Sequence, residues 1–318
     1  MNRPAELVRR LAAHPSRGAS RRLRTTLLLG VVLAMTAVVV PPASVRESPT
    51  SLMKVETADG VDHTPAVEWV LLLGSDARPG QSVTRSRADA IQLVGINTRT
   101  GAATAIGIPR DSWVDVPGHG NNKINAAMYF GGPQLMAQAV GNMVGIQPDY
   151  VFTTSFVGFA AMVNAIGGIT VSSKYAFSDP VRPKGYEVGR NKLNGIQAMV
   201  FARLRKPFPG GDFDRSANQQ RTLRGILAQV RYHQAEPGFM ERGVMSVLNH
   251  LDTPNVRPAE LYNLAQAATR IDPRKLEGCV IGGRVGYVGA ASVVFADIGQ
   301  ARSIAARTRA DATLDGGC

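Results

Sequence analysis

The chain has 318 residues, of which 44% are hydrophobic, and a formal net charge of +12 at pH 7. A chain of this length can bury a large core, and we expect one sizeable domain with appendages. Residues 1–24 hold seven arginines and one glutamate, so half of the net charge belongs to a short tail. The rest of the chain is too weakly basic to indicate a nucleic-acid groove, and we expect no nucleic-acid partner.

An uncharged, mostly apolar segment follows at 25–45 and approaches the ~20 residues that a bilayer requires. The arginines before it place its N-terminal side in the cytoplasm by the positive-inside rule. We therefore predict a basic cytoplasmic tail over 1–24 and a single-pass transmembrane helix over 25–45, with the bulk of the chain outside the cytoplasm. A cleaved signal peptide is the alternative, because the sequence at 41–44 suits a cleavage region. The segment 46–66 is rich in Pro, Ser and Thr and predicts an extended linker.

We expect the folded domain to start near Val67 and to run to residue 318, as alternating strands and helices. The expected strands cover 68–73, 89–96, 103–108, 150–154 and 169–172, with a strand pair over 279–295. The expected helices cover 133–144, 156–166, 215–230 and 298–310, with one more N-capped by Asn194, for which a strand over 199–204 is the alternative. The segment 118–123 is typical of a loop. This alternation predicts a layered α/β domain with a mixed sheet.

Four arginines gather between residues 193 and 230. Arg203 and Arg205 precede a turn rich in proline and glycine, and Arg215 and Arg221 lie in the first turns of the amphipathic helix after it. Unpaired N–H groups at a helix N-terminus favour an anion. Because planar guanidinium groups suit phosphate oxygens, the segment predicts a phosphate or pyrophosphate clamp. An ordinary solvated charged loop is the alternative.

Further charged residues stand where the predicted strands begin and end. Asp76 follows the first strand and Asp89 opens the second, while Arg87 and Arg110 lie close by. Ligand sites in open α/β sheets form at such strand ends. The two aspartates could together hold a divalent cation, since magnesium is commonly bound by one or two carboxylates plus substrate phosphates. For either aspartate alone, a role in a turn or a helix cap is the simpler interpretation.

Eight motifs in chain order carry a resemblance to a known family. They cover residues 67–230 and read LLLGSDAR, RSRAD, IPRD, KINAAMYFGGP, GFAAMVNAIGGITV, LNGIQA, ARLR and GDFDRSANQQR. In this order they resemble the LytR–CpsA–Psr family of cell-envelope phosphotransferases. The resemblance implies a single-span protein of the cell membrane whose extracytoplasmic catalytic domain is a three-layer α-β-α sandwich. It further implies transfer of a glycopolymer from a polyprenyl-pyrophosphate carrier to peptidoglycan, with Mg²⁺ as cofactor.

The resemblance also implies roles for single residues. By similarity, the catalytic residues are the arginines that hold the pyrophosphate, Arg87, Arg110, Arg203, Arg205 and Arg215, together with Asp212, which matches the family's aspartate before the helix arginine. The metal ligands are Asp76 and Asp89. The expected substrate-binding residues are Arg78, Lys123, Gln219 and Arg221, with Met143 and Val163 in an apolar lipid slot; plain core packing is the alternative for the last two. The chain departs from the family at Asp214, where glycine is usual. A second carboxylate there could pair with Arg215 or shift the metal.

The implied mechanism is in-line attack by a sugar hydroxyl of peptidoglycan on the sugar-side phosphorus, with polyprenyl phosphate as the leaving group. Arginines and magnesium would neutralise the charge on the leaving group and on the equatorial oxygens. Two other functions stay open: hydrolysis of a lipid pyrophosphate with water as acceptor, and non-catalytic regulation in the envelope. The sequence does not separate transfer from hydrolysis.

The sequence contains two cysteines, Cys279 and Cys318. In an exported domain such a pair predicts one disulfide that ties the C-terminus to the strand region. A free thiol on a frayed C-terminus is the alternative.

Overall fold

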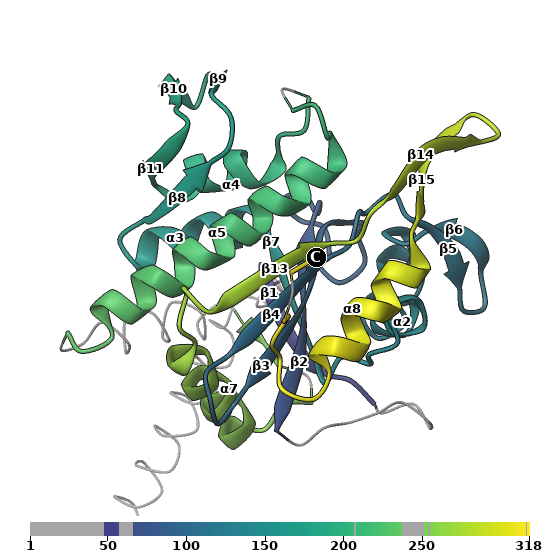
Figure 1. Ribbon diagram of the computed structural model, residues 1–318, viewed down its shortest axis with the longest axis horizontal. Coiled ribbons are helices and arrows are strands. Elements are labelled where there is room, and N and C mark those ends of the chain that lie inside the picture. Colours follow the sequence, from purple (N-terminus) through teal and green to yellow (C-terminus); the bar gives the residue numbers. More distant parts are fainter. Residues whose placement is uncertain (1–47, 57–65, 207, 237–250, 254, 316) are drawn as a thin grey trace, which may run out of the picture. The chain divides into compact units, whose positions relative to one another are not determined.

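Seven strands form a mixed sheet at the centre of the folded domain (Figure 1). This computed structural model describes residues 48–56, 66–206, 208–236, 251–253, 255–315 and 317–318. The strand order is β12-β1-β7-β2-β3-β4-β13. The strands are β1 (Thr50–Lys54), β2 (Val67–Ser75), β3 (Ala88–Asn97), β4 (Ala103–Gly107), β7 (Tyr150–Ser155), β12 (Leu251–Asp252) and β13 (Leu276–Val280). Because β2 runs antiparallel to β3 and parallel to β7, the sheet is mixed, as predicted.

Helices cover both faces of this sheet, because successive side chains along a strand point to opposite faces and both sets are apolar. Leu71 and Leu73 of β2 share a core with α2 (Ala126–Val144) and α8 (Ile298–Thr308). Val70, on the opposite face of the same strand, shares a second core with α7 (Pro258–Arg270) and α5 (Asp212–His233). A strand that is apolar on both faces has to be covered on both sides. The mixed sheet and its flanking helices confirm the predicted α/β class.

A second lobe packs against α5 and holds the third core (Figure 1). Its elements are α3 (Phe156–Ala165), α4 (Gly195–Arg203), the pair β8 (Ile169–Ser173) and β11 (Gly189–Leu193), and the pair β9 (Phe177–Asp179) and β10 (Arg182–Tyr186). Asn194 begins α4 with a reciprocal capping box, so the alternative of a strand over 199–204 is wrong. A Cβ at Gly195 would lie 2.0 Å from the carbonyl oxygen of Ala160, so only glycine lets α4 approach α3 this closely.

Three segments differ from the sequence predictions. β1 lies within 46–66, the expected linker, and pairs with β7 and β12, so the folded domain begins before Val67. The segment 118–123, expected as a loop, contributes β6 (Gly120–Lys123), which pairs with β5 (Trp113–Val116). α2 begins earlier than residue 133, with a kink at Gly132 (φ 68°) just before Pro133, which explains why the sequence suggests a later start.

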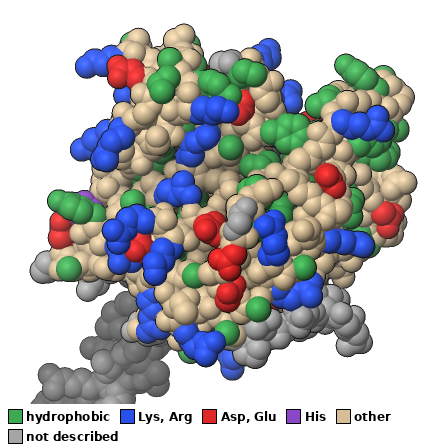
Figure 2. All heavy atoms as spheres, viewed as in Figure 1, with side chains coloured by type: hydrophobic (Ala, Val, Ile, Leu, Met, Phe, Trp, Pro, Cys, Tyr) green, Lys and Arg blue, Asp and Glu red, His purple; other side chains and the backbone are tan. Residues whose placement is uncertain are grey.

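The C-terminal region adds one sheet strand, a projecting hairpin and a disulfide. The predicted strand pair over 279–295 is confirmed as the antiparallel pair β14 (Gly283–Val288) and β15 (Ala291–Ala296), whereas Cys279 at its start belongs to β13 of the main sheet. The β14–β15 hairpin projects from the domain and carries exposed Val285 and Tyr287, and hydrophobic side chains gather over it in Figure 2. The predicted disulfide between Cys279 and Cys318 is confirmed.

The predicted cytoplasmic tail (1–24) and transmembrane anchor (25–45) lie outside the described residues. In the described part of the chain, no helix combines the length and the apolar character needed to cross a membrane.

Candidate active site

The candidate site lies at one edge of the sheet, where several strand ends meet. β2 and β4 end there, and antiparallel β3 begins there. This topology brings Asp76, Asp89 and Arg110 to one edge, since Asp76 follows β2, Asp89 is the second residue of β3 and Arg110 follows β4. The backbone N–H of Asp76 donates to the carbonyl of Arg87 at 3.0 Å, which joins the two segments. The strand-end location is therefore the one that the sequence predicts.

A charged pocket of about 390 Å³ opens at this edge. It is lined by Asp89, Arg110, Asp179, Met199, Val200, Arg203, Leu204, Arg205 and Arg215. Asp89 forms ion pairs with Arg110 and, at 3.8 Å, with Arg203. The side chains of Arg203 and Arg205 are 46% and 48% exposed, so both retain access to a ligand. Four guanidinium groups around one cavity suit a ligand with several phosphate oxygens.

A second carboxylate, Asp111, anchors cations from two other elements beside this pocket. Its oxygens lie 3.1 Å from Nζ of Lys123 and 3.7 Å from Nη1 of Arg205. Lys123 ends β6, and the N–H of Asn125 donates to the carbonyl of Arg110 at 3.2 Å. The β5–β6 hairpin and the start of α2 are thus fixed against the same corner of the sheet.

The most buried charges of the site are Asp212 and Arg215 in the first turn of α5. They form an ion pair, and their side chains are 9% and 6% exposed. Burial raises the pKa of the Asp212 carboxyl above its ordinary value, against the attraction of Arg215. Burial likewise lowers the pKa of the Arg215 guanidinium, against the attraction of Asp212. The Asp212 oxygens make no hydrogen bond of normal geometry, so the ion pair leaves this carboxylate short of donors.

The carboxylates of this edge fit a hard divalent cation. Asp76 and Asp89 stand at neighbouring strand ends, and Asp212 offers buried oxygens that lack hydrogen-bond donors. Oxygen ligands of this kind are those that Mg²⁺ prefers. Within the described residues, no group of three or more His, Cys, Asp or Glu side chains forms a metal site by itself. Such an edge suits a metal whose remaining ligands come from substrate phosphates.

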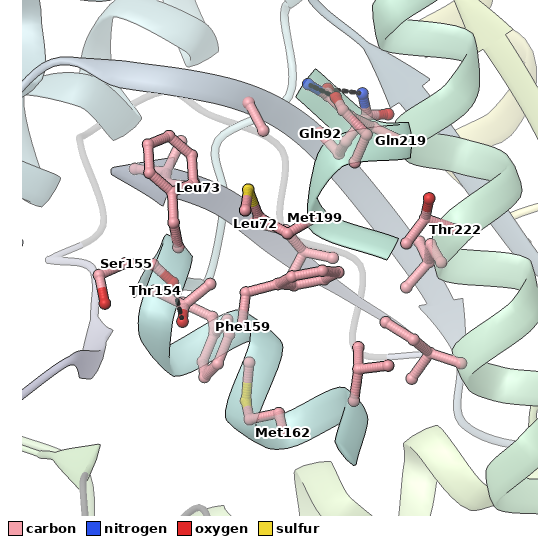
Figure 3. A pocket seen from close by; sticks show the side chains of 18 of the residues that line it. Leu72, Leu73, Gln92, Thr154, Ser155, Phe159, Met162, Met199, Gln219 and Thr222 are labelled. Carbon is pink, nitrogen blue, oxygen red and sulfur yellow. Dashed lines mark hydrogen bonds between the residues drawn. The ribbon is translucent and has the colours of Figure 1, made fainter. Parts of the chain in front are cut away.

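An apolar cavity of about 480 Å³ adjoins the charged pocket. Its walls come from the sheet, α3, α4, α5 and α7, and Figure 3 shows Leu72, Phe159 and Met162 around the space. The two cavities share four lining residues, which are Asp89, Met199, Arg203 and Arg215. At this junction the guanidinium carbon of Arg203 lies 3.7 Å from the centre of the Phe156 ring. An amphiphile with an anionic head and an apolar tail matches this pair of cavities.

The model of the LytR_cpsA_psr family matches residues 42–310. This chain belongs to the LytR–CpsA–Psr family. TagU of Bacillus licheniformis, named a polyisoprenyl-teichoic acid–peptidoglycan teichoic acid transferase, is 34% identical over 189 residues, which cover 58% of this chain and 59% of TagU. LcpB of Corynebacterium glutamicum, a probable cell wall biosynthesis protein, is 30% identical over 232 residues, which cover 69% of this chain and 54% of LcpB. The chain thus spans little more than half the length of these two curated relatives.

Solved structures of the LytR–CpsA–Psr type share the fold. The crystal structure of B. subtilis TagU superposes with a TM-score of 0.58 at 25% identity, covering 76% of this chain and 95% of that one. The structure titled TagT bound to LI-WTA superposes with a TM-score of 0.60 at 23% identity, covering 77% of this chain and 90% of that one. The sequence resemblance to the family and the α/β fold are therefore confirmed.

Within this LytR–CpsA–Psr domain, one face of α5 contributes lining residues to both cavities. Arg215, Gln219 and Ile226 lie on that face at helical spacing and line the apolar cavity. Gln219 also joins the helix to the sheet, because its Oε1 accepts from Nε2 of Gln92 at 3.0 Å (Figure 3). Arg221 lies on another face and donates to Oδ1 of Asn218 at 2.7 Å, outside both cavities. Of the four arginines expected to gather between residues 193 and 230, three line the charged pocket and Arg221 does not.

Several other predicted site residues lie apart from the two cavities. Arg78 and Arg87 are exposed and line neither cavity. Oδ1 of Asp76 accepts the N–H of Arg87 at 2.9 Å. This contact corresponds to the turn role that was the alternative to a metal ligand for Asp76. Asp214 does not pair with Arg215; it accepts the N–H of Gly210 at 2.8 Å and thereby closes the turn before α5.

The two residues expected in a lipid slot lie on opposite sides of the sheet. Val163 of α3 lines the apolar cavity. Met143 of α2 is 4% exposed and packs in the core between the sheet, α2 and α8, so its placement in the slot is wrong. Sequence reasoning also missed Asp111 and Asp179. Asp111 directly follows Arg110 in the motif IPRD, which could have drawn attention to it, whereas Asp179 stands in no motif.

Proposed function

We propose that the protein transfers a glycopolymer from a polyprenyl-pyrophosphate carrier to peptidoglycan and forms a phosphodiester link. The observation that carries this proposal is the shared wall of the two cavities. Arg203 and Arg215 stand where a cavity lined mainly by apolar side chains meets a pocket rich in guanidinium groups. A lipid pyrophosphate needs both environments at once, because its chain is apolar and its head carries several negative charges.

The names of the relatives support the substrate class. TagU proteins from several Bacillus species and from Enterococcus faecalis are named for transfer of teichoic acid to peptidoglycan from a polyisoprenyl carrier. We extend this activity to the present chain as a glycopolymer transferase, without assigning the glycopolymer.

In the proposed reaction, an acceptor hydroxyl oxygen attacks the phosphorus that bears the glycopolymer. The new O–P bond forms as the bond from this phosphorus to the bridging oxygen breaks, and polyprenyl phosphate leaves with the electron pair. Arg110, Arg203, Arg205 and Arg215 line the pocket around this charge and would stabilise its shift toward the leaving group. Magnesium held by Asp76 and Asp89, with Asp212 nearby, would supply further neutralisation of phosphate charge.

We also propose a single-pass membrane location with the catalytic domain outside the cytoplasm. It rests on the arginine-rich residues 1–24 beside the uncharged segment 25–45 and on the membrane-borne carrier. A reporter enzyme that is active only outside the cytoplasm should be active when fused to the end of the chain. An inactive reporter in a cell that retains the full-length fusion would contradict this topology.

The function is tested with the full chain in detergent, a polyprenyl-pyrophosphate oligosaccharide, fragments of peptidoglycan glycan, and magnesium. Mass spectrometry should detect the oligosaccharide joined to the glycan through one phosphate, together with polyprenyl phosphate. Release of phosphorylated sugar without joined product would indicate the hydrolase instead. Binding of the lipid without turnover would indicate a non-catalytic envelope regulator.

A further inference from the structure

A second carboxylate lines the charged pocket besides Asp89, and it comes from outside the sheet. Asp179 is the last residue of β9, in the hairpin of the second lobe. The carboxylates Asp89, Asp111 and Asp212 are all paired with cations of the site. Within the described part of the chain, Asp179 has no ion-pair partner at salt-bridge distance. Of the two carboxylates that line the pocket, Asp89 is held in ion pairs with arginines and Asp179 is not.

The arginine opposite Asp179 in the β9–β10 pair forms no ion pair with it. Arg182 stands opposite Asp179 in the register of β9 and β10. Its guanidinium group is turned to other acceptors, the carbonyl oxygens of Gly185 at 2.6 Å and of Lys192 at 2.9 Å and Oε1 of Gln197 at 3.3 Å. These hydrogen bonds hold the Arg182 guanidinium group away from the carboxylate of Asp179, which lines the charged pocket.

The hairpin that carries Asp179 is firmly attached to the lobe. Phe177, two residues before Asp179, stacks on Tyr186 with a centroid distance of 4.3 Å. The hydroxyl of Tyr186 donates to the carbonyl of Gln197 in α4 at 2.8 Å, and the Tyr186 side chain is buried. Because α4 also carries Arg203, the position of Asp179 is fixed relative to an arginine of the clamp. A carboxylate held in this way is pre-organised, as a catalytic group needs to be.

A purely structural role would not require a charge at this position. Oδ1 of Asp179 accepts the N–H of Val181 at 2.9 Å, which closes the turn over Pro180. Asparagine makes the same turn contact without a charge. A carboxylate in a pocket for pyrophosphate repels the ligand and weakens its binding. A charge at this position is therefore a cost, unless the reaction gains from it.

The proposed reaction has a use for such a group, because the acceptor hydroxyl has to lose its proton as its oxygen bonds to phosphorus. We propose that Asp179 is the catalytic residue that accepts this proton. As the O–P bond forms, the hydroxyl proton moves to a carboxylate oxygen of Asp179, and the bond to the bridging oxygen breaks to release polyprenyl phosphate. Asp179 then returns the proton to water. This inference rests on the proposed transferase function and adds the group that activates the acceptor.

The decisive variant is Asp179→Asn, which preserves the turn contact and removes the base. Positioned proton transfer typically contributes 10²- to 10⁴-fold to a rate, so we expect transfer to slow about a hundredfold or more at saturating substrates. The melting temperature should stay close to the wild-type value, and the affinity for the lipid substrate should not fall, because the substitution removes a charge that repels the pyrophosphate. Asp115→Asn is the matched control, because Asp115 is an exposed carboxylate of β5 that lines neither cavity, and it should transfer at the wild-type rate.

A second variant, Asp179→Ala, allows chemical rescue. Formate can enter the space of the missing carboxyl group, and we expect it to restore part of the transfer rate in Asp179→Ala but not in Asp179→Asn or the wild type. A wild-type rate in Asp179→Asn would overturn the inference. Absence of formate rescue in a folded Asp179→Ala protein would also overturn it, as would a rate loss in Asp179→Asn that excess magnesium reverses. If the wild-type protein itself transfers nothing, the proposed function fails, which these outcomes distinguish from failure of the Asp179 assignment.

Discussion

Removal of Arg215 should affect both folding and activity, unlike removal of the two half-exposed arginines of the pocket, Arg203 and Arg205. An exposed arginine of a solvated loop contributes little to folding stability. The Arg215 side chain is in fact 6% exposed and is paired with Asp212, which is 9% exposed. Removing one partner of a buried ion pair leaves an uncompensated buried charge and typically costs 3–5 kcal/mol. We therefore expect Arg215→Met to lower the free energy of unfolding by about 3 kcal/mol or more.

The pH dependence of this loss has a definite sign. Burial already raises the pKa of Asp212 above its ordinary value of 3.8, and Arg215 opposes that rise. Without Arg215 the pKa rises further, so the folded state binds a proton more readily than the unfolded state at pH values above 3.8. Stability of Arg215→Met should therefore fall as the pH rises through this window. The loss relative to the wild type should be smaller at pH 5 than at pH 7.

Urea denaturation at the two pH values measures this loss, with the double variant Asp212→Leu, Arg215→Met as the control. Replacing both charges with apolar groups should recover most of the stability, because no buried charge remains unpaired. Transfer should stay at least about a hundredfold below the wild-type rate in both variants, since a charge donor is missing. An unfolding free energy of Arg215→Met equal to that of the wild type at pH 7 would refute the reasoning.

Other substitutions separate the clamp from its surroundings. Arg203→Ala should slow transfer about a hundredfold with an unchanged melting temperature, whereas Arg221→Ala should leave initial rates near the wild-type value; equal losses would contradict the assignment. Phe159→Asp should prevent binding of a long-chain prenyl pyrophosphate while a short-chain analogue still binds, as titration calorimetry would show; equal loss of both would mean that Phe159 is ordinary core. Cys318→Ser opens a loop with a sequence separation of 39 and should cost about 4 kcal/mol in the chain-entropy model. Two reactive thiols in the unfolded, unreduced wild type would rule out that disulfide.

Local sequence signals predict the middle of the fold better than its edges. β3 and β4 are mostly apolar runs joined by a turn sequence, and Asn194 begins α4 because its side chain caps the helix. β1 and β6 lack such signals. β1 is five residues long and pairs with β7, about a hundred residues away in the chain, so its strand state depends on tertiary pairing.

The charged site was predictable where it follows from local spacing, and less so where it depends on packing. Arg203 and Arg215 border one turn and were expected together. Arg221 lies six residues after Arg215, a rotation of about 240° around an α-helix, so it points away from the same ligand. Asp179 reaches the pocket only because the second lobe folds over the sheet edge. No pattern in the sequence carries that information.

The central claim is that a lipid pyrophosphate spans the charged pocket and the apolar cavity. A crystal structure of the protein with a short polyprenyl pyrophosphate tests it most directly. We predict that the two phosphates contact Arg203 and Arg215 and that the prenyl chain runs between Phe159 and Ile226. A bound lipid whose chain lies outside this cavity, or whose phosphates contact neither arginine, would contradict the account.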